Sequence, residues 1–456
     1  MKTIKSRTFL KSLASLAAGL MCAAAAYAGT YTNDFSNPTP TGFTLNGGTR
    51  ADGVTPYPAI ENGYLALTYA ENSLQGSVVF DELDPGATMG GFTVTFNMRI
   101  GGGSSTPADG MAFFFGSDID ANANFGEEGP ASTAGITVSF DTYDNGGGEA
   151  PAIDVMVNGV QVAHKVVDVF YILSDAFTNV VIQLNANGIM NVVYKGQMVY
   201  TNLYLEGYAP ITGGRFAMGA RTGGLNENLW IDNLSITTAV AGAPVAPTIS
   251  AQNQPQNQTV NERSPVTFSV LPDGTPPFSF QWLSNNVAIA DATNRTYTIA
   301  NVPFTANAAK YKAQVSNGVG SIMSAEATLT VNQDVTAPTI TSVAGSETFA
   351  IVTVVFSEAV TAATAGTAGS YGLSGGLTIS SVTVVSPTTV QLTTSQQTPG
   401  TSYTLTVNNI QDTATTPNTI AANTTATFTA FVLSRGFLTW EFYGGVGGAA
   451  IGDLEA

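Results

Sequence analysis

The chain has 456 residues and carries 32 aspartates and glutamates against 15 lysines and arginines, a formal net charge of −17. So acidic a chain lacks the cationic surface that nucleic acids and anionic membranes attract, and neither is an expected partner. With one cysteine and one histidine, it has no pair for a disulfide and few residues for a hydrolytic triad.

A secretory signal peptide is the first predicted element, over residues 1–28. Basic residues precede an apolar run over residues 13–25, and Ala26-Tyr27-Ala28 has the small-x-small pattern of a cleavage site. We therefore expect a bacterial chain exported by the Sec route, cleaved after Ala28, and secreted, extracellular or held at the cell surface. No later apolar run approaches the roughly 20 residues that span a bilayer, so membrane insertion is not expected.

Short β-strands are predicted for almost all of the remaining chain. Apolar and polar residues alternate over runs rich in Val, Thr, Ile, Phe and Tyr, as in residues 92–98, 179–184 and 401–407, and Gly, Pro, Asn and Asp separate the runs. A period of two with turn residues between is typical of antiparallel sheets. No amphipathic helix is expected, and the fold class is all-β.

Two linkers divide this region into three domains. Residues 239–247 lack strand periodicity and contain two prolines, and residues 332–338 open a new set of strands at a proline. The predicted domains are residues 29–238, 247–332 and 333–430, with a tail over residues 431–456. The tail resembles the start of a truncated further β module.

Residues 247–332 resemble an immunoglobulin-like domain. Trp282 stands where the core tryptophan belongs, Tyr311 matches the tyrosine corner, and the usual bridging cysteines are replaced by Val270 and Ala313. The resemblance implies a β-sandwich with a purely hydrophobic core.

Residues 333–430 resemble the immunoglobulin-like or fibronectin-like repeats of bacterial surface proteins, through residues 337–340, 352–360 and 398–405. Glu358 and Asp412 are interpreted as solvated turn residues at strand ends. We expect this domain and the one before it to act as spacers.

The stretch from Pro107 to Glu149 contains the residues that indicate a ligand site. Asp109 precedes one apolar strand, Asp141 ends the next, and an acidic loop with three consecutive glycines, 146–148, follows. Aspartates at strand ends can also serve only as turn caps. Their occurrence together with a loop whose glycines allow close backbone approach favours a ligand site.

Residues 29–238 resemble the legume-type (L-type) lectins and the wider concanavalin A-like family. Residues 108–114 match the Ala-Asp-Gly strand opening of that family, residues 138–145 match its Phe-Asp-Thr-Tyr-x-Asn segment, and residues 216–224 and 230–236 resemble its closing strands. The resemblance implies a jelly-roll sandwich, followed in this chain by two immunoglobulin-like sandwiches.

The lectin resemblance implies a sugar site. In the family the aspartate of Ala-Asp-Gly accepts hydrogen bonds from sugar hydroxyls and often follows a cis peptide, a role that falls here on Asp109. We expect Gly110 and Asn145 to complete the site, with Asn145 as a donor and Tyr143 or Phe125 stacking on the sugar ring.

The resemblance also implies a calcium site, for which oxygen ligands are suited. The expected ligands are Asp141, Tyr143 through its backbone carbonyl, Asn145 and Glu149. The adjacent transition-metal site of the family is not expected, because its glutamate is Ser139 here and no histidine closely follows Glu149. His164 is interpreted as an ordinary surface or strand residue.

The leading hypothesis is a secreted, non-catalytic carbohydrate-binding protein with immunoglobulin-like spacers. A glycosidase of this fold would carry Glu-x-Asp-x-x-Glu on one strand; residues 82–87 come nearest, but they lack the second glutamate and contain Pro85. The remaining alternatives are a structural or adhesive surface protein without sugar binding, and the non-catalytic part of a larger polysaccharide-degrading enzyme.

Overall fold

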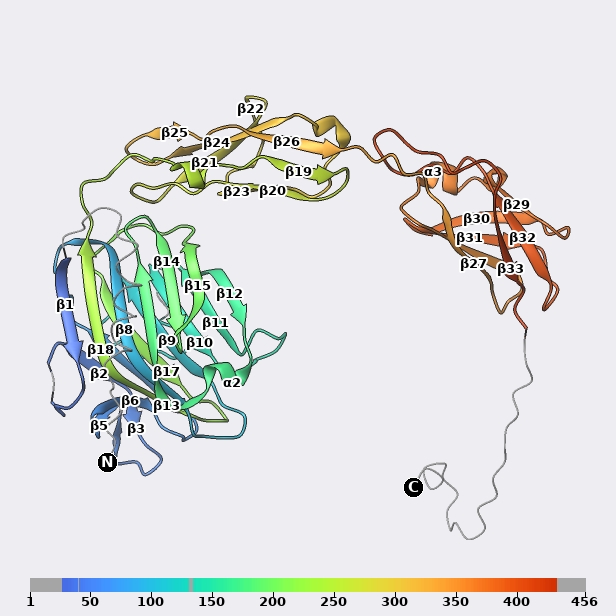
Figure 1. The fold of residues 1–456 in the computed structure, drawn as a ribbon. Helices are drawn as coiled ribbons and strands as arrows, with labels where there is room; N and C mark the ends of the chain where they lie inside the picture. Colours follow the sequence, from blue (N-terminus) through green and yellow to red (C-terminus); the bar gives the residue numbers. More distant parts are fainter. Residues whose placement is uncertain (1–26, 40, 131–133, 433–456) are drawn as a thin grey trace, which may run out of the picture. The chain divides into compact units, whose positions relative to one another are not determined.

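In the computed structural model, which describes residues 27–39, 41–130 and 134–432, the regular secondary structure is nearly all β-strand (Figure 1). The α-helices among these residues, α2 (Val169–Ile172) and α3 (Ala362–Ala365), have four residues each. The predicted all-β class is therefore confirmed. Most of the predicted signal peptide and most of the tail lie outside the described residues. Within the described ranges, no helix is long and apolar enough to cross a membrane.

Two large antiparallel sheets form the first part of the chain, as expected for a jelly roll. The nine-stranded sheet has the order β15-β14-β13-β8-β18-β6-β5, with β1 paired to β18 and β16 paired to β8. Its strands are β1 (Tyr27–Asn33), β5 (Ala59–Glu61), β6 (Tyr64–Thr68), β8 (Thr88–Gly101), β13 (Ser174–Leu184), β14 (Ile189–Tyr194), β15 (Gln197–Tyr204), β16 (Ile211–Thr212) and β18 (Asn228–Val240).

The seven-stranded sheet has the order β12-β11-β10-β9-β17-β7-β2. Its strands are β2 (Phe43–Asn46), β7 (Gln75–Phe80), β9 (Gly110–Gly116), β10 (Gly135–Asp141), β11 (Ala152–Val157), β12 (Val160–Val166) and β17 (Arg215–Arg221). A separate two-stranded sheet pairs β3 (Gly48–Thr49) with β4 (Pro56–Tyr57).

The main hydrophobic core lies between the two large sheets and draws residues from both. Phe92 of β8 meets Phe113 of β9 and Phe216 of β17, at ring-centroid distances of 5.7 and 5.3 Å. Phe216 also stacks on Phe115 at 4.6 Å. These aromatic contacts bridge the two sheets. They stabilise the sandwich, because burial of apolar surface supplies most of its stabilising free energy.

β9 is buried on both faces, which explains its continuous apolar run. Successive side chains of a strand point to opposite faces, and Phe113 and Phe115 belong to the main core. Phe114 points the other way, into a second cluster with Ile119 and Phe125 from the loop that follows the strand. A central strand covered on both sides needs no polar face.

The middle segment, residues 247–332, forms a six-stranded and a two-stranded sheet. The six-stranded sheet contains β19 (Gln258–Asn261), β21 (Ser279–Ser284), β22 (Val287–Ala288), β24 (Lys310–Ser316), β25 (Ser321–Met323) and β26 (Ala327–Asn332), and the other pairs β20 (Val266–Ser269) with β23 (Thr296–Ile299). Trp282 and Ala313 are fully buried, and Val270 and Tyr311 nearly so. These four residues are core residues, as predicted.

The last described segment contains a four-stranded and a three-stranded sheet. Their strands are β27 (Ile340–Gly345), β28 (Ile351–Phe356), β30 (Ile379–Ser386) and β31 (Thr389–Thr394), and β29 (Tyr371–Leu373), β32 (Ser402–Val407) and β33 (Thr424–Thr429). Both sheets contribute to one hydrophobic core.

The compact units of the chain do not follow the predicted linkers. Among the described residues, one unit contains those up to 256 together with 268–297 and 311–326, and the other contains 257–267, 298–310 and those from 327 to 432. The division passes through the middle segment. The predicted domain boundaries, and the immunoglobulin-like nature of the second and third domains, stay predictions.

Truncating Phe216 should test the aromatic contacts between the large sheets. We expect Phe216→Ala to lower the free energy of unfolding by about 3 to 5 kcal/mol, because it removes a ring packed against three others and leaves a cavity. The matched control is Phe170→Ala, which removes a ring that is 80% exposed and should change stability by less than about 0.5 kcal/mol. Urea unfolding followed by circular dichroism measures both, and equal midpoints for the two variants would contradict the assignment.

Candidate functional site

Three neighbouring strands end side by side at one edge of the seven-stranded sheet. In the antiparallel register, Gly110 of β9 is opposite Asp141 of β10 on one side and Arg221 of β17 on the other. Asp109, one residue before β9, therefore lies close to both. The Ala108–Asp109 peptide is cis, as the lectin resemblance implies.

Gly110 is required by the packing of the backbone at this point. A Cβ atom there would lie 2.2 Å from the carbonyl oxygen of Phe140, and its φ is +132°, a conformation that side chains disfavour. Gly110 thus allows β9 and β10 to approach at the site. Whether Gly110 also contacts a sugar, as predicted, is not tested by this geometry.

A shallow hollow of about 500 Å³ opens at this edge. It is lined by residues 73–75, 108–109 and 221–225, together with Tyr143 and Asn145. Three of the four predicted sugar-binding residues, Asp109, Tyr143 and Asn145, are therefore brought together. Gly110, the next residue after Asp109, is not among the lining residues.

Phe125 cannot stack on a ligand, so this part of the expected site is wrong. Its side chain is only 5% exposed and packs in the cluster with Phe114 and Ile119 on the outer face of β9. The loop after β9 needs an apolar anchor on the sheet, and Phe125 is that anchor. Tyr143, which is half-buried, is the aromatic residue that lines the hollow.

Asp109 is held by an arginine that the sequence did not single out. The Nε of Arg221 donates to Oδ2 of Asp109 at 2.9 Å, and its Nη2 donates to Oε1 of Glu127 at 2.5 Å. Glu127 is 3% exposed, and burial raises its pKa to about 7, although Arg221 lowers it. Arg221 could have been identified only from the pairing of β17 with β9, which places it opposite Gly110.

A second buried glutamate lies behind the hollow. Glu227 is fully buried, and Oγ1 of Thr142 donates to its Oε1 at 2.8 Å. The backbone N–H of Thr142 donates to the carbonyl of Asp109 at 3.0 Å, which connects Glu227 to the site. Burial, together with the carboxylates of Asp109 and Asp141, raises the pKa of Glu227 to about 8.

The predicted metal ligands form an acidic group beside the hollow. Burial, together with the nearby carboxylates of Asp154, Glu149 and Asp109, raises the pKa of Asp141 to about 6. One oxygen of Asp141 accepts from the Tyr143 N–H at 3.0 Å, and one oxygen of Glu149 accepts from the Asn145 N–H at 2.7 Å. Their remaining oxygens are donors of the kind that calcium prefers, so the residues fit a hard cation in chemistry.

His164 lies in β12, where it pairs with Asp154. The two side chains face each other across β11 and β12, with Nδ1 of His164 2.7 Å from Oδ1 of Asp154. Asp154 is in turn opposite Ser139 of β10. The interpretation of His164 as a strand residue is confirmed. The expectation that no transition metal binds stays a prediction.

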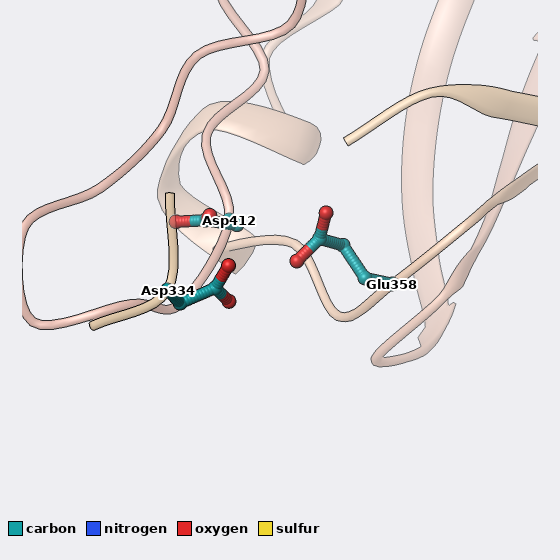
Figure 2. A group of neighbouring side chains, drawn as sticks. All are labelled: Asp334, Glu358 and Asp412. Atoms are coloured by element: carbon teal, nitrogen blue, oxygen red, sulfur yellow. The ribbon is translucent and has the colours of Figure 1, made fainter. Parts of the chain in front are cut away.

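The side chains of Asp334, Glu358 and Asp412, in the second compact unit, lie close together (Figure 2). One oxygen of each lies within 4.8 Å of the others. The interpretation of Asp412 as solvated is wrong, because it is fully buried. Its oxygens accept from the backbone of Ala414 and from both nitrogens of Asn418. The chain turns back on itself after β32, and these donors satisfy the buried carboxylate.

The segment nearest to a glycosidase motif does not form a strand. Residues 81–87 connect β7 to β8 without strand structure, and Asp84 accepts a hydrogen bond from the Thr238 hydroxyl at 2.5 Å. Glu82 and Asp84 are therefore not presented along one strand, as that chemistry would need.

Residues 57–168 match the legume-like lectin family. The match contains both motifs on which the resemblance was based, Ala-Asp-Gly and Phe-Asp-Thr-Tyr-x-Asn, and the predicted lectin resemblance is confirmed. No curated protein sequence matches the chain.

Solved structures similar to the chain include lectins. The VIP36 exoplasmic/lumenal domain in its Ca²⁺/Man3GlcNAc-bound form is 19% identical, with 44% of this chain and 84% of that chain covered and a TM-score of 0.34. The lectin from Bauhinia forficata in complex with GalNAc is 17% identical, with coverages of 47% and 99% and a TM-score of 0.35. The Emp47p carbohydrate recognition domain is 14% identical, with coverages of 46% and 95% and a TM-score of 0.36.

The buried Glu227 should make stability depend on pH. Its pKa is raised from 4.5 in the unfolded chain to about 8 in the fold, so the folded state binds its proton more tightly. Its stabilising contribution is complete below pH 4.5 and is lost as the pH rises toward 8. We expect the thermal midpoint to fall over this range.

The variant Glu227→Gln should reduce the fall of the thermal midpoint with pH. The difference should be clearest above pH 7, because Glu127, whose pKa is about 7, has by then lost most of its proton. Differential scanning calorimetry at a series of pH values measures it. An identical slope in the wild type and in Glu227→Gln would show that Glu227 does not hold its proton in the fold.

Proposed function

We propose that the chain is a carbohydrate-binding protein whose ligand occupies the hollow at the ends of β9, β10 and β17. The observation that carries this proposal is the meeting of Asp109, Tyr143 and Asn145 in one shallow opening, in a region that matches the legume-like lectin family. Asp109 supplies an acceptor, and Tyr143 and Asn145, from a later loop, supply an aromatic ring and an amide. These are the groups with which proteins orient sugars on an open surface.

Each group has a distinct role in the proposed complex. Oδ2 of Asp109 is engaged by Arg221, which leaves Oδ1 to accept a hydrogen bond from a sugar hydroxyl. The exposed side chain of Asn145 can donate to a neighbouring oxygen, and the half-buried ring of Tyr143 offers an apolar surface. Hydrogen bonds to a carboxylate are the strong ones, so Asp109 contributes most to affinity.

A calcium ion would be held by Asp141, Glu149 and Asn145, with the carbonyl of Tyr143. Such an ion would supply positive charge beside carboxylates that are close enough to raise the pKa of Asp141. It would also tie the loop that carries Asn145 to the end of β10. The residues of the loop, rather than the ion, would contact the sugar.

The wider organisation completes the proposal. We infer an exported protein in which residues 29–238 bind glycan without catalysis, and in which residues 247–332 and 333–430 are immunoglobulin-like spacers. The predicted signal peptide and the acidic composition support this arrangement.

Removing the carboxylate of Asp109 should weaken glycan binding. We expect Asp109→Ala to weaken binding at least about tenfold, since it removes a charge-assisted hydrogen bond worth more than about 1.4 kcal/mol. A glycan microarray identifies a ligand for the wild type, and isothermal titration with that ligand gives the affinities. The matched control is Asp52→Ala, which removes an exposed aspartate bonded only within its own turn. Unchanged affinity of Asp109→Ala would refute the assigned site.

Added calcium should raise the thermal midpoint of the chain. A ligand that binds only the folded state stabilises it by about 2.7 kcal/mol at a hundred times its dissociation constant. Scanning calorimetry with calcium and with a chelator measures the shift. Asp141→Asn should remove it, whereas Glu358→Gln, which alters the other acidic cluster, should leave it intact. A midpoint that calcium does not move would contradict the metal site.

A further inference from the structure

The loop between β9 and β10 carries a buried carboxylate, that of Glu127, which contacts Arg221 in the lining of the hollow. Ile119 and Phe125 anchor this loop on the outer face of the seven-stranded sheet, against Phe114. Glu127 follows two residues later and is 3% exposed. A carboxylate is rarely buried so fully without a partner, and the partner here is the guanidinium of Arg221.

Arg221 connects Glu127 to Asp109 through two different nitrogens. Nη2 donates to Oε1 of Glu127 at 2.5 Å, and Nε donates to Oδ2 of Asp109 at 2.9 Å. The Asp109 backbone N–H also donates to the Arg221 carbonyl at 3.0 Å. The planar guanidinium can satisfy both carboxylates only in one orientation, because its donors have a fixed geometry.

We propose that Glu127 and Arg221 form a positioning pair that fixes the carboxylate of Asp109 for ligand binding. Glu127 holds the guanidinium, the guanidinium occupies Oδ2 of Asp109, and Oδ1 is left toward the hollow. The inference rests on the proposed function, since it assigns these residues to the same site. Neither residue was among the predicted ligands.

The exposure of Arg221 explains why Glu127 is needed. The arginine side chain is 36% exposed, so without Glu127 its long chain would be free to turn toward solvent. Asp109 would then lose the partner of Oδ2, and its carboxylate would sample more than one orientation. A ligand would have to order it on binding, which costs affinity.

The charge balance shows that Arg221 serves the protein rather than an anionic ligand. Its single positive charge is shared between Asp109 and Glu127, and Glu128 lies close enough to influence its pKa. The pair therefore leaves the hollow without net positive charge. Arg221 acts by orienting Asp109.

Three variants and a control test the pair in the full chain. Glu127→Leu removes the acceptor but keeps apolar volume, Glu127→Gln keeps a carbonyl acceptor, and Arg221→Met removes the donors. The control Arg50→Met breaks a similar arginine–glutamate pair with Glu71, 2.5 Å apart, outside the lining of the hollow. Thermal midpoints establish that each variant is folded.

The first readout is affinity for the glycan that binds wild type best on a microarray. We expect Glu127→Leu and Arg221→Met to bind at least about tenfold more weakly. Glu127→Gln should stay within about threefold of wild type, and Arg50→Met should match it. A purely structural role for Glu127 would lower the midpoints of Gln and Leu variants without separating their affinities. Equal affinities of Glu127→Leu and wild type would overturn the proposal.

The second readout is the orientation of Asp109 in crystal structures of the wild type and Glu127→Leu. We expect its carboxylate to be displaced or split between conformers in the variant. An unchanged carboxylate would overturn the positioning role. Because this readout needs no sugar, it separates the two hypotheses: a wild type that binds no glycan on the array refutes the proposed function, and the Asp109 orientation still decides the positioning pair.

Discussion

The register of β10, β9 and β17 is the constraint on which the site depends. It brings the ends of three strands into line and places Asp141, Asp109 and Arg221 at one edge. The register is held by the core, because a slip of one residue would turn Phe113 and Phe115 out of the space between the sheets. The aromatic packing of the sandwich and the geometry of the hollow are thus set by the same pairing.

Two buried glutamates connect to Asp109, although their burial is unfavourable. Glu127 and Glu227 each have one oxygen that is buried without a hydrogen bond, as far as the described residues show, and such groups cost stability. Each connects to Asp109 through one intermediate residue, Glu127 through Arg221 and Glu227 through Thr142. Asp109 is therefore held at both its carboxylate and its backbone carbonyl.

Local patterns predicted the strands and the two motifs, since alternation and turn residues are properties of short segments. They failed where burial depends on distant residues. Phe125 was expected to be one of two rings available to a ligand and Asp412 to be solvated, but a loop that folds over the sheet buries Phe125 and a turn of the chain buries Asp412. Glu127 had no signal at all, because nothing in residues 126–129 shows which arginine will face them. Arg221 could have been found only from the pairing of β17 with β9.

The carboxylates of the site differ in whether the chain places a positively charged side chain beside them. Arg221 compensates Asp109 within the protein, and His164 faces Asp154. Asp141 and Glu149 have no cationic side chain paired with them among the described residues, and their mutual repulsion contributes to the raised pKa of Asp141. In the proposed complex, a calcium ion would relieve that repulsion and tie the loop that carries Asn145 to the end of β10. Asp109 would need no such ion, because the chain itself supplies its partner, Arg221.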